Sequence, residues 1–232
     1  MKKMKFMTLG MCLAVLVSCG TATKNGALIG TGAGAALGAI IGKIAGNTAV
    51  GAAIGGAVGA GTGALIGKHM DKVKAQAQAV QNAQVESVTD ANGLQAVKVT
   101  FDSGILFATG SSTLSATAKS SLAKFAEVLK QNTDCDVAVQ GYTDNAGWKN
   151  STAEQSVQKN LNLSQQRAQA VTNYLNSLGV SNNQIRSTTG FGEANPVADN
   201  STAAGKAQNR RVEVYMYASQ AMIQAAEAGT LQ

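Results

Sequence analysis

Glycine recurs at every fourth residue between residues 26 and 67, and this spacing limits what the first third of the chain can fold into. Two runs make up the repeat, Gly26, Gly30, Gly34, Gly38, Gly42 and Gly46, then Gly51, Gly55, Gly59, Gly63 and Gly67. A four-residue spacing aligns glycines along one side of an α-helix, where a second backbone can approach closely. The five-residue step from Gly46 to Gly51 breaks the phase. We therefore predict a glycine-zipper helical hairpin that turns near Gly46 and Asn47.

The composition of this segment favours lipid over water as its surroundings. Each glycine costs about 1 kcal/mol relative to alanine in a water-exposed helix. At 1.5 Å per residue each predicted helix is roughly 25–30 Å long, close to the hydrocarbon thickness of a bilayer. Charges between residues 19 and 70 are limited to Lys24, Lys43 and Lys68. A flexible Gly/Ala linker is the alternative interpretation, whereas a nucleotide loop is excluded because no Ser or Thr follows either Gly-Lys pair.

The first 18 residues have the pattern of an export signal. Lys2, Lys3 and Lys5 precede an apolar stretch that is too short to span a bilayer. The stretch ends in Leu16-Val17-Ser18-Cys19, which resembles the lipobox of bacterial lipoproteins. That resemblance implies cleavage before Cys19 and acylation of its thiol, with residues 19 to 25 as a lipidated tether. An ordinary signal peptide is the alternative.

Charge and cysteine usage exclude several classes of function. Removal of the leader lowers the net charge from +6 to +3, because three lysines leave with it. Residues 90 to 232 carry 11 basic and 11 acidic side chains, so the sequence gives no basic stripe for nucleic acid. Cys135 is the one cysteine left for the globular region, and we interpret it as a small, partly buried residue. His69 is interpreted as a solvated residue at a helix end, and no metal site or cofactor is predicted.

The region from residue 84 to residue 218 predicts one α+β domain. Apolar spacing and turn signals indicate a hairpin of strands 84–88 and 94–101, a helix from Ser115 to about Lys130, a strand 137–141, a helix that opens at Asn160 or Ser164 and stops at Gly179, and strands 185–190 and 211–217. The order β-α-β-α-β-β implies a mixed sheet with both helices on one face. The remaining predicted segments are the zipper hairpin 26–70, an Ala/Gln-rich linker 71–83 and a C-terminal tail 219–232.

Three segments of this domain place a carboxylate and a guanidinium where a ligand can be held. They read Gly141-Tyr142-Thr143-Asp144-Asn145, Asn160-x-x-Leu163-Ser164-x-x-Arg167-Ala168 and Asn209-Arg210-Arg211-Val212-Glu213-Val214. Asp144 follows a strand, and Arg167 lies at the edge of the apolar face of a helix. An aspartate complements an ammonium and a guanidinium grips a carboxylate, so the two could clamp a zwitterion. From spacing alone, a salt bridge between Asp144 and Arg167 explains them equally well.

The same segments resemble the OmpA-like, MotB-type C-terminal domain, over residues 94 to 217. The resemblance implies that Asp144 and Arg167 bind the diaminopimelate side chain of peptidoglycan, that Asn160 helps to hold it and that Arg210 borders the site. Two departures from the family pattern stand out. Residues 146–159 form a longer loop that contains Trp148, and Ala108 stands where relatives carry a polar side chain.

These observations predict a non-catalytic lipoprotein that binds peptidoglycan and tethers the outer membrane to the cell wall. The predicted partners are peptidoglycan and outer-membrane lipid, with the domain in the periplasm and a homo-oligomer formed through the glycine zipper. The alternative is an oligomeric, membrane-active zipper assembly that the wall-binding domain positions. An enzyme is not predicted, because the globular region shows no nucleophile–base pair, metal site or paired carboxylates.

Overall fold

The computed structural model describes residues 60–89 and 94–231. The predicted signal peptide, Cys19, the first glycine helix and most of the second lie outside the described residues. The elements are α3 (Ala60–Ala77), β1 (Ala83–Thr89), β2 (Gln95–Asp102), α4 (Ser103–Leu106), α5 (Ala116–Gln131), β3 (Cys135–Gly141), α6 (Ala153–Ser177), β4 (Ile185–Gly190), α7 (Ala203–Asn209), β5 (Arg211–Ala218) and α8 (Gln220–Glu227). Within those two ranges, no helix is long and apolar enough to cross a membrane.

The five strands form one mixed sheet in the order β1-β2-β5-β3-β4. Strands β1 and β2 pair as an antiparallel hairpin, and the last strand, β5, lies between β2 and β3 and is antiparallel to both. Only β3 and β4 pair in parallel among these strands, because α6 crosses over between them. The predicted mixed sheet is confirmed.

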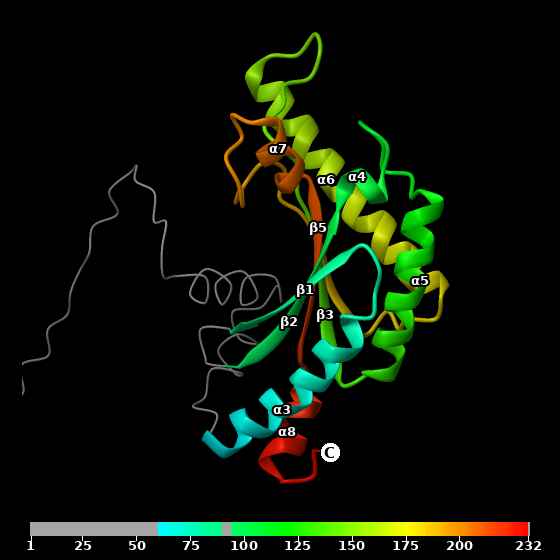
Figure 1. Cartoon of the computed structure of the whole chain (residues 1–232), viewed down its shortest axis with the longest axis vertical. Coiled ribbons are helices and arrows are strands. Elements are labelled where there is room, and N and C mark those ends of the chain that lie inside the picture. Colours follow the sequence, from blue (N-terminus) through cyan, green and yellow to red (C-terminus); the bar gives the residue numbers. More distant parts are fainter. Residues whose placement is uncertain (1–59, 90–93, 232) are drawn as a thin grey trace, which may run out of the picture. The chain divides into compact units, whose positions relative to one another are not determined.

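One face of the sheet carries the core. On β2 the side chains of Val97, Val99 and Phe101 alternate inward, and each is at most 1% exposed. They join Val137 and Val139 of β3 and apolar residues of α3, α5, α6 and α8 in a single cluster. Helices α5 and α6 lie along the same side of the sheet (Figure 1). The prediction of helices on one face is therefore confirmed.

Helix α3 belongs to this core, although the sequence assigned its two halves to the zipper and to a linker. Ile66, Met70, Val73 and Ala77 recur at helical spacing and are all 0% exposed. The predicted boundary at residue 70 thus falls inside one helix that packs against β2. Burial of such a large side chain contributes about 1.5–3 kcal/mol. Residues 71 to 77 therefore hold the domain together and do not act as a spacer.

The start of α6 differs from the prediction. It begins at Ala153, where the Thr152 hydroxyl accepts from the backbone N–H of Gln155 at 3.2 Å and the Gln155 side chain accepts from the Thr152 N–H at 3.0 Å. This reciprocal capping box satisfies two backbone donors and fixes the helix start. Asn160 and Ser164 consequently lie inside the helix. The predicted long loop is shortened, since residues 153–159 are helical.

Other local predictions have mixed outcomes. Helix α5 starts after Ser115, whose side chain accepts from Ala118 N–H at 2.9 Å, as predicted. Gly179 follows α6 with a φ of 91°, a conformation that glycine adopts without strain. The predicted C-terminal tail is wrong at residues 220–227, because α8 buries Met222 and Ile223 in the core.

His69 is a further correction. It lies within α3, its side chain is 16% exposed, and its Nε2 is 3.2 Å from a carboxylate oxygen of Asp134. His69 thus lies in the middle of α3 and its side chain is mostly buried, so the prediction of a solvated histidine at a helix end is wrong. Cys135, the first residue of β3, is fully buried.

Candidate binding cleft

A cleft of about 680 Å³ opens at the end of the sheet where β3 ends and β5 begins. Helices α4 and α7 and the first turns of α6 lie at this end of the molecule (Figure 1). The cleft is lined by all four residues predicted for the site, Asp144, Asn160, Arg167 and Arg210. It is also lined by Phe107, Ala108, Trp148, Lys149 and Lys206.

Close packing between α6 and the sheet brings these residues together. A Cβ added to Gly141 would lie 2.2 Å from the backbone oxygen of Ser164, and one added to Gly190 would lie 2.2 Å from the backbone nitrogen of Gln165. Only glycine lets the helix backbone approach the strands so closely. The Ser164 hydroxyl fills the contact, accepting from Gly192 N–H at 2.8 Å. This close contact at Ser164 holds Asn160 and Arg167, each about one helical turn from Ser164, against the end of β3.

Asp144 is held in place by the backbone and by Arg210. Asp144 is 7% exposed, and one of its carboxylate oxygens accepts from the backbone N–H of Ala146 at 3.1 Å. The other oxygen accepts from Nη1 of Arg210 at 2.5 Å. The salt bridge between Asp144 and Arg167, considered as an alternative, is replaced in the described part of the chain by this pair with Arg210. The carboxylate still has unused lone pairs, because it can accept about four hydrogen bonds.

Arg167 is a buried cation that backbone oxygens hold. The residue is 3% exposed, Nε donates to the Ser111 carbonyl at 2.9 Å, and Nη2 donates to the Ala108 carbonyl at 3.4 Å. Its guanidinium lies 5.2 Å from the ring centre of Phe107. Burial, and next the nearby Arg210, lower the pKa of Arg167, while Asp144 acts in the opposite direction. Among the described residues its Nη1 has no hydrogen-bond partner, so that nitrogen can donate to a ligand.

Asn160 supports the loop that carries Asp144. Its Nδ2 donates to the Ala146 carbonyl at 3.2 Å and lies 3.5 Å from the Asp144 carbonyl. Its Oδ1 accepts from the indole N–H of Trp148 at 2.7 Å. The residue is 4% exposed and lines the cleft. The structure thus gives Asn160 the position of a residue that orients Asp144 and Trp148.

The Asn209-Arg210-Arg211 motif sends three side chains to three places. Asn209 is fully buried and holds the preceding loop, with Oδ1 accepting from the N–H groups of Val197 and Ala198 at 2.8 and 3.0 Å. Arg210 points to the cleft and its side chain is 39% exposed. Arg211 begins β5 and donates from Nε to Glu213 at 2.7 Å on the face opposite the core. Asn209 is the last residue of α7 and Arg211 is the first residue of β5, so the side chain of Arg210 leaves the connection between them, at the cleft.

Several cleft residues were not assigned roles from the sequence. Lys149 and Lys206 have no motif and reach the cleft only through the fold. Ala108 contributes its backbone oxygen to Arg167, a contact that does not depend on its side chain. Arg167, Arg210, Lys149 and Lys206 outnumber Asp144, and this balance suits a ligand that is mainly anionic but carries one cation.

Comparison with known proteins finds two segments of this chain that match family models. Residues 106–210 match the OmpA family, and residues 1–71 match the YMGG-like Gly-zipper family. The four predicted site residues lie within the OmpA match. The chain thus has a segment similar to the OmpA family, preceded by a segment similar to the YMGG-like Gly-zipper family.

Three proteins that are similar to this chain have names that refer to the cell envelope. The "Probable lipoprotein YiaD" of Escherichia coli is 38% identical over 64% of this chain and 63% of its own length. The "Peptidoglycan-binding protein ArfA" of Mycobacterium bovis is 43% identical over 40% of this chain and 26% of its own length. The solved "cell wall anchor of the T6SS" of Pseudomonas aeruginosa is 28% identical, with a TM-score of 0.52, over 65% of this chain and 97% of that one. The chain thus spans less than two thirds of the first two relatives.

Proposed function

We propose that this protein, with its OmpA-family domain, is a non-catalytic lipoprotein that binds peptidoglycan and tethers the outer membrane to the cell wall. The ligand is the diaminopimelate of the stem peptide, whose free end carries an ammonium and a carboxylate on one carbon. Two of the three relatives described above are named for peptidoglycan binding or for cell-wall anchoring, which supports the proposal.

The observation that carries the proposal is the placement of Asp144 and Arg167 on one cleft without a direct bond between them. A ligand with both charges can thus lie between the two groups. The Nη1 of Arg167 donates to the ligand carboxylate, and the remaining lone pairs of Asp144 accept from the ammonium. Charged hydrogen bonds of this kind contribute about 1.5–3 kcal/mol each.

Arg210 has a separate part in the proposed complex. It is the more exposed of the two arginines, and its bond to Asp144 orients the carboxylate before the ligand arrives. When the ammonium binds Asp144, the guanidinium of Arg210 is free to donate to an acidic group of the same ligand. The exchange keeps the charges paired in both states, so little desolvated charge is left uncompensated.

The lining of the cleft provides groups for ligand recognition. Among the described residues that line it, Asp144 is the carboxylate that can accept from an ammonium, and Arg167 and Arg210 can donate to acidic groups. The proposed role therefore assigns Asp144 and Arg167 to ligand recognition.

Co-sedimentation of the full chain in detergent with purified peptidoglycan tests the proposal. Asp144→Asn keeps the shape but removes the charge, and we expect a loss of affinity of about 10- to 100-fold. Asp136→Asn is the matched control, because Asp136 forms an ion pair with Arg186 at 2.9 Å outside the cleft. Equal binding by both variants and the wild type would refute the site.

Anchoring at Cys19 remains a proposal from the sequence, since Cys19 lies outside the described residues. We expect Cys19→Ser to leave the protein without acyl chains and to release it from membranes. Mass spectrometry of the mature N-terminus checks this. A wild-type protein with an unmodified N-terminus at another residue would contradict the lipid anchor.

Association of several chains through the glycine zipper is a further part of the proposal. It rests on the glycine spacing and on the match to the Gly-zipper family. Crosslinking in membranes measures it, with Gly34, Gly38, Gly55 and Gly59 replaced by leucine for comparison. A wild-type chain that stays monomeric would count against the zipper as an oligomer contact.

A further inference from the structure

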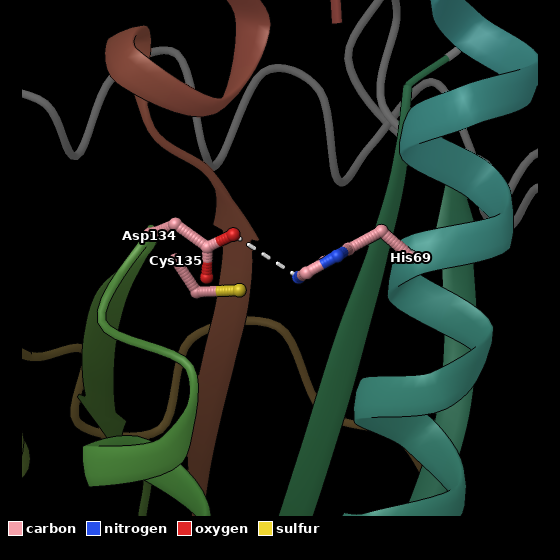
Figure 2. A group of neighbouring side chains, drawn as sticks. All are labelled: His69, Asp134 and Cys135. Atoms are coloured by element: carbon pink, nitrogen blue, oxygen red, sulfur yellow. Dashed lines mark ion pairs between the residues drawn. The ribbon is translucent and has the colours of Figure 1, made fainter. Parts of the chain in front are cut away.

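A second group of polar side chains lies away from the cleft, where β3 begins. It consists of His69 from α3, Asp134 from the turn before β3, and Cys135, the first residue of β3. Figure 2 shows that the three side chains converge, with the sulfur of Cys135 beside the Asp134 carboxylate and facing His69. One ligand atom from each residue lies within 4.8 Å of the other two. Nε2 of His69 and an oxygen of Asp134 are 3.2 Å apart.

We propose that His69, Asp134 and Cys135 bind one zinc ion that joins α3 to the start of β3. Imidazole nitrogen, carboxylate oxygen and thiolate sulfur are the three kinds of ligand that zinc takes in proteins. Their bonds to zinc are about 2.0–2.3 Å long, so two ligands of one tetrahedral ion lie about 3.3–3.6 Å apart. Nε2 of His69 and the Asp134 oxygen match this spacing at 3.2 Å, and side-chain rotations can close the other separations, which are at most 4.8 Å.

The backbone around the cluster is already fixed. Cys135 N–H donates to the Asn132 carbonyl at 3.1 Å, and the Asp134 carbonyl accepts from Ser219 N–H at 3.2 Å. On the other side, the buried Met70 anchors the turn of α3 that carries His69. Asp134 and Cys135 are therefore positioned at the start of β3, and His69 is positioned by α3, before an ion arrives. This lowers the ordering cost of binding.

The surroundings offer a further ligand and a route from solvent. Sδ of Met70 lies 3.9 Å from Sγ of Cys135, so a thioether is close to the site. The side chains of His69 and Asp134 are 16% and 35% exposed, which leaves an approach for the ion and a position for water. Calcium and magnesium are not expected, because they prefer sites made of oxygen alone. On zinc binding the Cys135 S–H bond breaks, its proton goes to solvent, and the sulfur bonds to the ion.

Zinc titration of the full chain in detergent, after removal of metals by a chelator, tests this site. We expect one zinc per chain and a rise of about 5–10 °C in the melting temperature at a hundredfold excess over the Kd. Cobalt substitution should add the absorption of a cobalt–thiolate bond. Cys135→Ala and His69→Gln should lose the ion and the temperature rise.

Asp136→Asn is the matched control, since Asp136 is one residue beyond Cys135 and bonds to Arg186 outside the cluster. It should bind zinc as the wild type does. Circular dichroism of each metal-free variant establishes that it is folded before its zinc affinity is compared. Absence of saturable binding, binding that survives Cys135→Ala and His69→Gln, or saturation by copper(I) but not by zinc would overturn the proposal.

Discussion

The two ends of β3 have different tasks. At its last residue, Gly141, the chain runs into the Asp144 loop, where polar side chains line an open cleft. At its first residue, Cys135, the chain lies in the core against α3 and α8. The cleft end thus has exposed cations and the ion pair between Asp144 and Arg210, while the other end has close apolar packing beside the cluster of His69, Asp134 and Cys135. Function and stability are separated along one seven-residue strand.

This difference shows which substitutions separate binding from folding. Residues at the cleft end contact loops and line the cleft, so their loss should change affinity more than stability. Residues at the other end contact the core, so their loss should change stability first. Helix α6 is the exception, because it packs on the sheet and also carries Arg167.

The largest effect is expected from removing α3. A fragment that starts at residue 84 loses the burial of Ile66, Met70 and Val73, each worth about 1.5–3 kcal/mol. The sum is comparable with the whole stability of a domain, about 5–15 kcal/mol. Denaturant unfolding followed by circular dichroism should show a folded fragment from residue 60 and a largely unfolded one from residue 84. Equal midpoints would show that α3 does not stabilise the domain.

Gly190→Ala should have the second largest effect, and it should lower both the stability of the domain and its affinity for peptidoglycan. The new Cβ meets the backbone of α6 at 2.2 Å, and overpacking of this kind costs about 1–3 kcal/mol or more. Because α6 must move, affinity for peptidoglycan should fall together with the melting temperature. Gly147→Ala is the control for stability alone, since its Cβ has only an ordinary 3.8 Å contact with Ser156 and Gly147 itself lines the cleft. Similar stability for both variants would contradict the close contact between Gly190 and the backbone of α6.

Arg167→Lys should lower binding more than it lowers stability. Lysine keeps the charge, but its single nitrogen cannot replace the three nitrogens of a guanidinium that donates to Ser111, to Ala108 and to the ligand, so affinity should fall about 10- to 100-fold, nearly as much as in Arg167→Ala. The melting temperature should fall less than in Gly190→Ala. Arg186→Lys, outside the cleft, is the control. Binding to a diaminopimelate peptide and melting are measured together, and lower stability with unchanged affinity would reject Arg167 as a ligand residue.

Gly63→Ala should give the smallest effect, and it should be stabilising. Gly63 is in α3 and an added Cβ would meet nothing within 4 Å, so the helix should gain about 0.5–1 kcal/mol. Gly67→Ala should gain less, because its Cβ would approach Gln95 to 3.3 Å. Neither change should alter peptidoglycan affinity. A loss of stability in Gly63→Ala would show that this position needs glycine for a contact outside the described residues.

Local patterns predicted much of this architecture. The Ser115 cap, the alternation in β2 and the Gly179 stop are encoded within a few residues, and each is confirmed. Helix α3 was divided because its apolar positions overlap a glycine repeat, whose spacing of four predicts helix packing in lipid just as well. The start of α6 was missed although Thr152 and Gln155 form a capping-box pattern.

Long-range pairing could not be predicted in the same way. Asp144 was matched with Arg167 by charge, but its partner in the structure is Arg210, 66 residues away. His69 and Cys135 were interpreted separately, because nothing in their spacing indicates that α3 crosses the start of β3. Such pairings depend on the strand order, in which the last strand takes a central place.

The contact between the first and last described helices sets the order in which this domain can fold. Helix α3 packs with α8, and β5 completes the middle of the sheet. A chain that emerges from its N-terminus has produced α3 long before α8. The part of α3 that packs on α8 therefore stays uncovered until nearly the whole chain is available, and such non-local closure slows folding. The apolar side of α3 is therefore expected to need protection against aggregation until the C-terminal helix has been made.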